Sequence, residues 1–368
     1  MMSDTGLLQT PFHDWHATNG GRMVEFGGWH MPVQYSTIVE EHNVVRNSAG
    51  LFDISHMGRL QFSGDDACSF LDYLLTNDVS KLQVGQVRYS LVCSESGGVL
   101  DDVLVYRLAD CYMLVVNASN RAKIVEWIGQ HISKFNVKFE DQTLTHAMIA
   151  VQGPKAVEIL VALGAEAAAE HRYYSVSSMT VAGMDALVSR TGYTGEDGFE
   201  LIVPNEAGLE LWKVLLETGQ LFGVQACGLG CRDTLRLEAA MPLYGHELNE
   251  DTDPLTAGLS FAVKLEAADF IGRDSLRKIA ESPTGKVRVG LELEGKRIAR
   301  EGAGVLSGEQ SVGEVTSGTF SPTLQKAIAM GYVDAAVSES GTKVEIDIRR
   351  KRHTARVVDL PFYKRENP

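Results

Sequence analysis

The stretch HAMIAVQGP, residues 146–154, decides the fold class of the longer part of the chain. Its first six residues, a histidine followed by five apolar residues, are typical of a strand. Gly153-Pro154 then opens a helix, because proline is tolerated at the first helical position. Further strands are predicted at 186–189 and 200–203, followed by an amphipathic helix around Trp212. Strand–helix–strand modules of this kind predict an α+β fold.

The sequence upstream shows the same alternation of helices and strands. A helix capped by acidic residues is predicted at 65–76, and a second helix starts near Ser119, with isoleucine repeated every four residues. Between the two helices, strands are predicted at 89–93, 102–107 and 112–116.

The chain changes character at a boundary near 275–285, where the segment ESPTG, residues 281–285, interrupts the pattern. Short alternating stretches separated by turn residues follow, and this spacing predicts a small all-β barrel. Its strands are expected at 287–293, 313–317, 328–333, 343–348 and 354–358.

Composition places the protein among ordinary globular proteins, with 368 residues, 44% apolar and 22% charged. That length predicts about two or three domains. The formal net charge of -14 argues against general binding to nucleic acid or to an anionic membrane. One dense basic run, RRKRH at 349–353, is expected to be a strand end or hairpin, with a docking site for an acidic partner as the alternative.

The five cysteines predict reduced thiols in a cytosol, because their number is odd and no C-x-x-C pair occurs. Cys227 and Cys231 are expected to be small buried residues near a helix start rather than metal ligands, since no clustered histidine pair completes a zinc pattern. The sequence has no run of ~18 consecutive apolar residues, so no membrane span is predicted. The first residues include Asp4, and no signal or transit peptide is predicted.

The segment GGVLDD, residues 97–102, is the first candidate site. Its glycines allow a sharp turn or a close approach of the backbone to a ligand. Because neighbouring strand residues point to opposite faces, Asp101 and Asp102 should not act as a pair, and one of them can face a cavity. The alternative is a hairpin turn with two solvated acids.

The segment RTGYTGEDGFE, residues 190–200, has three glycines in seven residues and predicts an irregular loop. It lacks the Lys-Ser/Thr of a phosphate loop and the spacing of a dinucleotide fingerprint. Tyr193 and Glu200 in such a loop suit a flat ring with N–H donors, such as a pterin, because the aromatic ring stacks and the carboxylate accepts two parallel hydrogen bonds. The alternative is an ordinary surface turn.

The segment CGLGCRDTLRLE, residues 227–238, places glycines before a helix on which Arg232 and Arg236 share one face. A helix start with an arginine is a natural site for a carboxylate. The alternative is a helix whose arginines pair internally with Asp233 and Glu238.

Two more segments complete the set. VTSGTFSPTL, residues 315–324, is expected to be a structural polar turn between strands. FDISHM, residues 52–57, contains His56, which is expected to be a satisfied core histidine rather than a catalytic base, because its neighbours are apolar.

These five segments, in this order, resemble the aminomethyltransferases of the glycine cleavage system, the T-protein family. The resemblance covers nearly the whole chain, from Arg22 to Arg365. Each segment alone is a weak signal, whereas five in register are specific.

The resemblance implies an α+β fold of three domains in a cloverleaf around a central channel for tetrahydrofolate. The implied domains are a discontinuous folate-binding domain, an inserted α+β domain that carries the Gly-Gly-x-x-Asp-Asp motif, and a C-terminal β-barrel. Their boundaries are 1–50 with 145–275, 51–144, and 280–368.

It also implies a reaction in the bacterial cytoplasm with lipoylated H protein as the partner. The methylene carbon of an aminomethyl group on the lipoyl thiol passes to tetrahydrofolate, ammonia leaves, and 5,10-methylenetetrahydrofolate and dihydrolipoyl H protein remain. Tetrahydrofolate is the one-carbon acceptor, and neither a metal nor a flavin is implied. Because H proteins of this system tend to be acidic, a local basic patch is expected to dock them.

The family's functional positions carry over residue by residue. Asp101 matches the catalytic aspartate of the family. Matches to folate-binding or pocket-lining positions are Met57, Tyr89, Val115, Asn117, Tyr193, Glu200, Arg232 and Arg365.

Two departures from relatives concern the rim of the implied pocket, which has Met241 where some members have Tyr and Ser260-Phe261 where several have Ser-Trp. Two rival functions remain open, a tetrahydrofolate-dependent demethylase of the same fold and a non-enzymatic folate-binding module.

Overall fold

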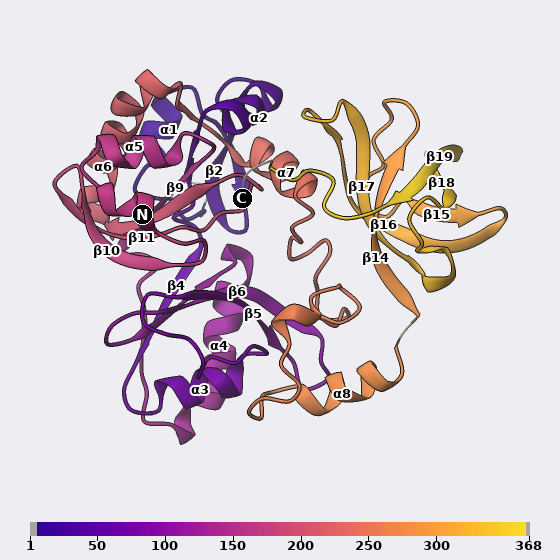
Figure 1. Cartoon of the computed structure of the whole chain (residues 1–368), viewed down its shortest axis with the longest axis horizontal. Helices are drawn as coiled ribbons and strands as arrows, with labels where there is room; N and C mark the ends of the chain where they lie inside the picture. The colour runs from indigo at the N-terminus through magenta and orange to yellow at the C-terminus, as the bar shows by residue number, and fades with distance from the viewer. Residues whose placement is uncertain (1–5, 284, 366–368) are drawn as a thin grey trace. The chain divides into compact units, whose positions relative to one another are not determined.

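The computed structural model describes residues 6–283 and 285–365 (Figure 1). The predictions that involve Asp4 and Thr284 fall outside these residues. Its α-helices are α1 His13–Thr18, α2 Ile38–Asn47, α3 Ala67–Leu74, α4 Arg121–His131, α5 Ala156–Ala162, α6 Asn205–Gly219, α7 Leu229–Glu238 and α8 Arg273–Glu281.

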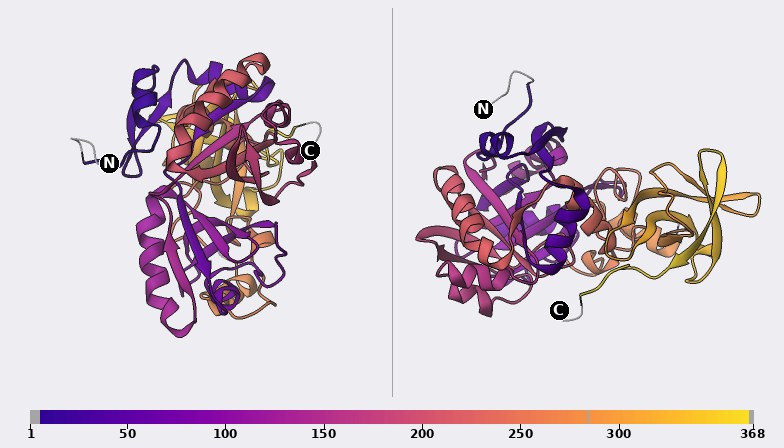
Figure 2. Two further views of the ribbon diagram at one scale, coloured as in Figure 1. Left: turned by 90° about the vertical axis from the view of Figure 1, so that its left-hand side faces the viewer. Right: turned by 90° about the horizontal axis from the view of Figure 1, so that it is seen from above.

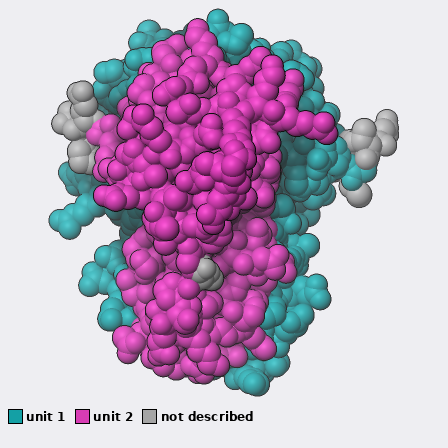
Figure 3. Space-filling model, turned by 90° about the vertical axis from the view of Figure 1, so that its right-hand side faces the viewer, with its two compact units in different colours: residues 1–72, 78–90, 103–232 teal, residues 73–77, 91–102, 233–368 magenta. Residues whose placement is uncertain are grey.

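Contacts divide the described chain into two compact units, coloured separately in Figure 3. Unit 1 takes residues within 1–72, 78–90 and 103–232, and unit 2 takes residues within 73–77, 91–102 and 233–368. The division into three domains stays a prediction.

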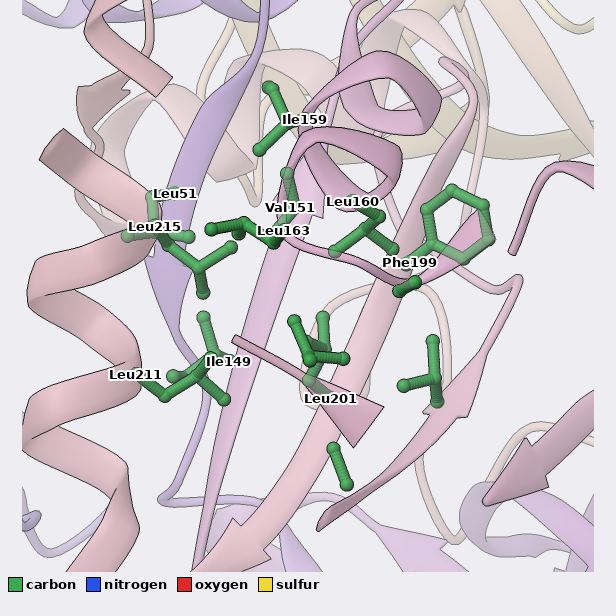
Figure 4. Close-up of a cluster of buried hydrophobic side chains, with 14 of the residues drawn as sticks. Leu51, Ile149, Val151, Ile159, Leu160, Leu163, Phe199, Leu201, Leu211 and Leu215 are labelled. Carbon is green, nitrogen blue, oxygen red and sulfur yellow. The ribbon is translucent and has the colours of Figure 1, made fainter. Parts of the chain in front are cut away.

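A six-stranded sheet forms the centre of unit 1, in the order β10-β11-β12-β9-β3-β13. The strands are β3 Gly50–Asp53, β9 His146–Gln152, β10 Val176–Val181, β11 Met184–Ser189, β12 Gly198–Pro204 and β13 Gln225–Ala226. Its apolar side chains pack with those of α5 and α6 in one buried cluster that includes Ile149, Leu160, Leu201 and Leu211 (Figure 4). The predicted strand is therefore confirmed as β9 and the predicted helix as α5. The helix begins at Ala156, so Pro154 precedes it and does not occupy its first position.

A second sheet has five strands in the order β5-β6-β7-β4-β8, and a two-stranded hairpin joins β1 to β2. Their bounds are β1 Arg22–Phe26, β2 Trp29–Gln34, β4 Gly58–Ser63, β5 Val87–Cys93, β6 Val99–Arg107, β7 Tyr112–Val116 and β8 Lys138–Asp141. The three strands predicted between 89 and 116 and the helices at α3 and α4 are confirmed.

The predicted C-terminal barrel is confirmed as a closed barrel of six strands, drawn in orange and yellow in Figures 1 and 2. The strands, in the order β14-β17-β16-β15-β18-β19, enclose a core that includes Leu291, Val315 and Ile346. Their bounds are β14 Lys286–Leu293, β15 Gly304–Ser307, β16 Gln310–Ser321, β17 Lys326–Asp334, β18 Lys343–Ile348 and β19 Lys351–Val358.

The expectation of a polar turn across 315–324 is wrong. Strand β16 continues to Ser321 and pairs with β17 as far as Lys326, after a register shift between Val315 and Ser317. The polar side chains are satisfied there by buried partners, since Thr316 donates to Glu247 (Oγ1 to Oε1, 2.6 Å). The expectation of a structural role is consistent with these bonds.

The basic run forms the hairpin that the sequence predicts. Strands β18 and β19 pair up to Ile348 and Lys351, so Arg349 and Arg350 form the turn, with φ of 55° and 64°. Arg352 is already paired with Glu309 at 2.7 Å and Glu345 at 3.4 Å. The two turn arginines and the neighbouring Lys351 are exposed as well.

Among the described residues, no helix has the length and apolar character needed to cross a membrane.

Candidate functional site

Glu200 lies in the middle of unit 1 on β12, opposite Ser189 of β11 and Ala150 of β9. Its side chain is buried, and its Oε2 accepts a hydrogen bond of 2.6 Å from the Thr191 hydroxyl. Burial raises the pKa of Glu200 and outweighs the opposing effects of Thr191 and Arg232. The structure therefore holds a buried carboxylate on a strand with a neighbour on each side.

Arg232 of α7 lies beside this carboxylate. Its guanidinium carbon is 4.9 Å from the centroid of the Tyr193 ring. Burial lowers the pKa of Arg232, and Glu200 partly offsets that effect. Although the residue as a whole is only half-buried, its Nη1 atom is buried and has no hydrogen-bond partner among the described residues.

A buried guanidinium nitrogen without an acceptor is costly, so native structures usually supply one, from the protein, from water or from a ligand. Tyr193, Glu200 and Arg232 thus bring together an aromatic ring, a buried acceptor and a buried donor. The sequence predicted these three residues as a site from two separate segments, and the structure places them side by side.

The loop that carries Tyr193 is hydrogen-bonded to β9, and its residues Thr191 and Thr194 are buried, which argues against the alternative of an ordinary surface turn. Gln152 donates from Nε2 to the Thr191 carbonyl and accepts from the Thr194 hydroxyl, each at 3.0 Å. A Cβ at Gly192 would lie 1.9 Å from Gln152 Oε1, so a larger residue here would displace the amide that makes these two hydrogen bonds.

Two arginines fix the acids of the same loop. Arg190 bonds both oxygens of Asp197, at 2.9 and 2.5 Å, and Arg46 of α2 bonds Glu196 at 2.9 Å. Asp197 and Glu196 are therefore paired with arginines of the protein itself. Glu200 is the carboxylate next to Arg232. Sequence spacing gave no signal for the roles of Arg46 and Gln152.

His56 is buried, as expected, but it is not satisfied. Its Nδ1 atom has no hydrogen-bond partner within the part of the chain that the structure describes. Burial, together with the nearby Arg232 and Arg59, lowers the pKa of His56 to about 4, so the ring is neutral at physiological pH. The expectation of a satisfied histidine is therefore wrong, because none of the described residues supplies a partner for Nδ1.

Asp53 in the same segment is part of a buried chain of side chains that the sequence did not reveal. Tyr35 Oη lies 2.7 Å from His16 Nδ1, and His16 Nε2 lies 3.0 Å from Asp53 Oδ2. Burial raises the pKa of Asp53, but the hydrogen bonds, His16 first, outweigh it and hold the pKa below its usual value. This chain fixes the segment that leads to His56 and Met57.

The other predicted binding residues of unit 1 lie on strands or at their ends. Met57 follows His56 directly, Tyr89 is half-buried in β5, Val115 is buried in β7, and Asn117 comes just after β7. Their binding roles stay predictions.

Asp101 belongs to unit 2, on β6, and is fully buried, whereas Asp102 is half-buried. The prediction that the two acids face different surroundings is confirmed. The alternative of two solvated acids is wrong, because Asp101 has no exposed surface. Gly98 is required here, since a Cβ would lie 1.8 Å from the Glu250 carbonyl oxygen.

Arg365, also in unit 2, is half-buried after the last barrel strand.

The second arginine of α7 has a structural role. Arg236 bonds Asp233 at 2.8 Å and Glu247 at 2.7 Å. Internal pairing of Arg236 with Asp233 is confirmed. Glu238 accepts hydrogen bonds from the hydroxyls of Ser321 and Thr323.

One group of three potential metal ligands occurs within the described ranges. The ligand atoms of Glu41, Cys227 and Cys231 lie within 4.8 Å of one another, and all three residues are buried. Glu41 already accepts hydrogen bonds from the backbone nitrogens of Tyr35, Ser36 and Gly228. Since its carboxylate is satisfied by the protein, we assign this group a structural role, and the absence of a metal stays a prediction.

Comparison with known proteins identifies two family matches in this chain. The GCVT N-terminal domain matches residues 12–267, and the glycine cleavage T-protein C-terminal barrel domain matches residues 286–364.

Curated relatives extend over nearly the full length of the chain. An aminomethyltransferase of Symbiobacterium thermophilum is 49% identical over 97% of this chain and 98% of its own length. Another from Bacillus mycoides is 47% identical over 98% of this chain and 99% of its own. A crystal structure of glycine cleavage system aminomethyltransferase T from Bartonella henselae superimposes with a TM-score of 0.92 at 35% identity, covering 97% of this chain and 98% of that one.

Proposed function

The chain belongs to the glycine cleavage T-protein family of aminomethyltransferases, and we propose that it transfers a methylene carbon from the lipoyl arm of H protein to tetrahydrofolate. The aminomethyl group on the lipoyl sulfur loses ammonia, and its carbon becomes bonded to two nitrogens of the folate. The products are 5,10-methylenetetrahydrofolate, ammonia and dihydrolipoyl H protein.

The arrangement of Tyr193, Glu200 and Arg232 carries this proposal. A pterin presents adjacent N–H donors on a flat ring, and a buried carboxylate such as Glu200 accepts two of them in parallel. The orphaned Nη1 of Arg232 offers a charged donor to an acceptor atom of the same ligand. The residues present therefore fit a folate.

Asp101 is the proposed catalytic residue, and Met57, Tyr89, Val115, Asn117 and Arg365 are proposed to contact the folate. A buried carboxylate beside the reacting nitrogen orients it and helps to move a proton as ammonia departs. The proposed setting is the bacterial cytoplasm, where thiols stay reduced, and all five cysteines are free.

A turnover assay tests the function directly. Purified protein is mixed with tetrahydrofolate and aminomethyl-loaded H protein, and ammonia and methylenetetrahydrofolate are measured. Stoichiometric release of both supports the proposal. Demethylation of a methylated donor without activity on H protein would favour the demethylase, and folate binding without any turnover would favour the binding module.

Glu200→Ala is expected to weaken tetrahydrofolate binding by about tenfold or more. Its loss leaves the pterin N–H donors unpaired, and a hydrogen bond to a charged group is typically worth about 1.5–3 kcal/mol. Calorimetry measures the affinity, with Glu210→Ala, an exposed acid on α6, as the control. Equal affinity in the wild type and Glu200→Ala would remove Glu200 from the folate site.

The basic run from Arg349 to Arg352 is proposed to dock the acidic H protein. Charge reversal at Arg350 and Arg352 is expected to raise the Michaelis constant for H protein at low salt, as added salt does to the wild type, because screened contacts mainly set the association rate. Reversal at Arg350 should have the larger effect, since Arg352 is already paired with Glu309.

Folate affinity, which should change little, is the internal control for this measurement. An unchanged Michaelis constant would leave the run as a hairpin without a docking role. The alternative cluster of Arg288, Lys296, Arg297 and Arg300 would then be reversed in the same assay.

A further inference from the structure

Three hydroxyl groups stand behind the Glu200 carboxylate in unit 1, and we name Tyr106, Ser189 and Thr191 the hydroxyl network. Thr191 Oγ1 donates to Glu200 Oε2 at 2.6 Å, and Ser189 Oγ lies 2.8 Å from Thr191 Oγ1. Tyr106 Oη lies 3.5 Å from Ser189 Oγ. All four residues are buried and come from β6, β11, β12 and the loop between the last two.

The direction of the hydrogen bonds follows from the chemistry of the groups. Because the Thr191 hydroxyl donates its proton to Glu200, the Thr191 oxygen accepts a hydrogen bond from the Ser189 hydroxyl. Burial, followed by the charge of Glu200, raises the pKa of Tyr106 far above its ordinary value, so its hydroxyl keeps its proton and remains a donor. Hydrogen bonds in such a chain polarise one another in the same direction.

The other charged or titratable groups around Glu200 are few. Arg232 faces it from α7 and favours the anion. Tyr193 lies against Arg232, and the neutral His56 lies near that arginine too. Burial thus disfavours the charged form of Glu200, whereas Arg232 and the hydroxyl network favour it.

We propose that Thr191 and Tyr106 are positioning residues that keep Glu200 ionised and aimed at the pterin, so that they set the pH range over which the protein binds folate. This inference rests on the proposed function, in which Glu200 must accept hydrogen bonds from the pterin. A protonated carboxyl would present a donor to the pterin N–H groups and lose that match.

The test compares Thr191→Val, which removes the hydroxyl at nearly constant volume, with Thr191→Ser, which keeps it. Losing a hydrogen bond to the carboxylate raises its pKa, so binding should fail at a higher pH. The affinity for tetrahydrofolate, measured by calorimetry across pH, is expected to fall with acidification about one pH unit earlier in Thr191→Val than in the wild type. Thr191→Ser should follow the wild type, and Tyr106→Phe should shift in the same direction as Thr191→Val.

A second measurement reads Glu200 without folate. The infrared carboxylate band of protein labelled with ¹³C-glutamate, minus that of Glu200→Gln, gives the titration of this one side chain. The inference predicts the same upward shift of this titration in Thr191→Val and Tyr106→Phe. Tyr106→Phe keeps the test available if Thr191→Val does not fold.

The outcomes separate the inference from the proposed function. Identical Glu200 titrations in the wild type, Thr191→Val and Tyr106→Phe overturn the inference, as does a Thr191→Ser variant that behaves like Thr191→Val. A shifted titration with unshifted folate binding overturns the placement of Glu200 in the folate site instead. Parallel shifts in both measurements support both.

Discussion

Asp101→Asn is expected to lower turnover with tetrahydrofolate and aminomethyl-loaded H protein by about 10²–10⁴-fold, while folate binding is largely kept. Asparagine preserves the size of the side chain and removes its charge and basicity. The proposed reaction needs a group that orients the attacking nitrogen and helps to move a proton when ammonia departs. A fully buried carboxylate next to a glycine turn fits that role.

The neighbouring acid provides a matched control for this prediction. Asp102→Asn makes the same chemical change one residue away, on the opposite, half-buried face of β6. Single-turnover kinetics and folate calorimetry should show a slow chemical step in Asp101→Asn and near-normal behaviour in Asp102→Asn. Near-normal turnover in Asp101→Asn would reject the assignment of this residue.

Arg236→Met is expected to destabilise the protein by about 3–5 kcal/mol, because it leaves the buried anion of Glu247 without its partner. The side chains of Arg236 and Glu247 are 2% and 0% exposed, and their atoms Nη1 and Oε2 lie 2.7 Å apart. Burial raises the pKa of Glu247, but Arg236 and the hydroxyls of Ser317 and Thr316 outweigh it and lower the pKa below its ordinary value.

The sign of the pH effect follows from that lowered pKa. In the wild type, the contribution of Glu247 is present above its unfolded pKa and is lost as pH falls through its folded pKa. In Arg236→Met the buried carboxylate gains by taking up a proton, so the gap in stability between variant and wild type should narrow in acid. Denaturant unfolding of the full chain at several pH values measures this gap.

An exposed ion pair of the same barrel unit is the control. Arg352 and Glu309 have the same 2.7 Å separation at the surface, and Arg352→Met should change stability far less, because solvent screens exposed pairs. Equal losses in the two variants would show that the burial of Arg236 does not determine its contribution.

The barrel and the α+β sheets could be predicted because apolar residues recur in local patterns along their strands. Residues such as Val289, Leu291 and Leu293 face the barrel core at every second position, and that period is visible without any knowledge of the fold. The opposite surroundings of Asp101 and Asp102 were predictable for the same reason.

Other features depend on partners distant in sequence. The segment at 315–324 looked like a turn because it is polar, yet it is mostly strand, since Arg236, Glu238 and Glu247 supply the buried hydrogen bonds that its hydroxyls need. A polar stretch of sequence shows that its side chains need hydrogen-bond partners. It does not show whether distant residues of the fold supply them.

The sequence by itself determined the fold class, the barrel and the family, because these rest on local periodicity and on motifs in a fixed order. It also predicted the three residues of the candidate site. Only the tertiary structure decided which polar groups share a buried environment. Thr191 lies next to Glu200, and the Nη1 of Arg232 and the Nδ1 of His56 have no hydrogen-bond partner among residues 6–283 and 285–365. These environments arise where strands and helices far apart in sequence meet. Contacts between residues distant in sequence determine the pKa values of buried groups and whether their hydrogen bonds are satisfied. No local sequence pattern encodes these contacts.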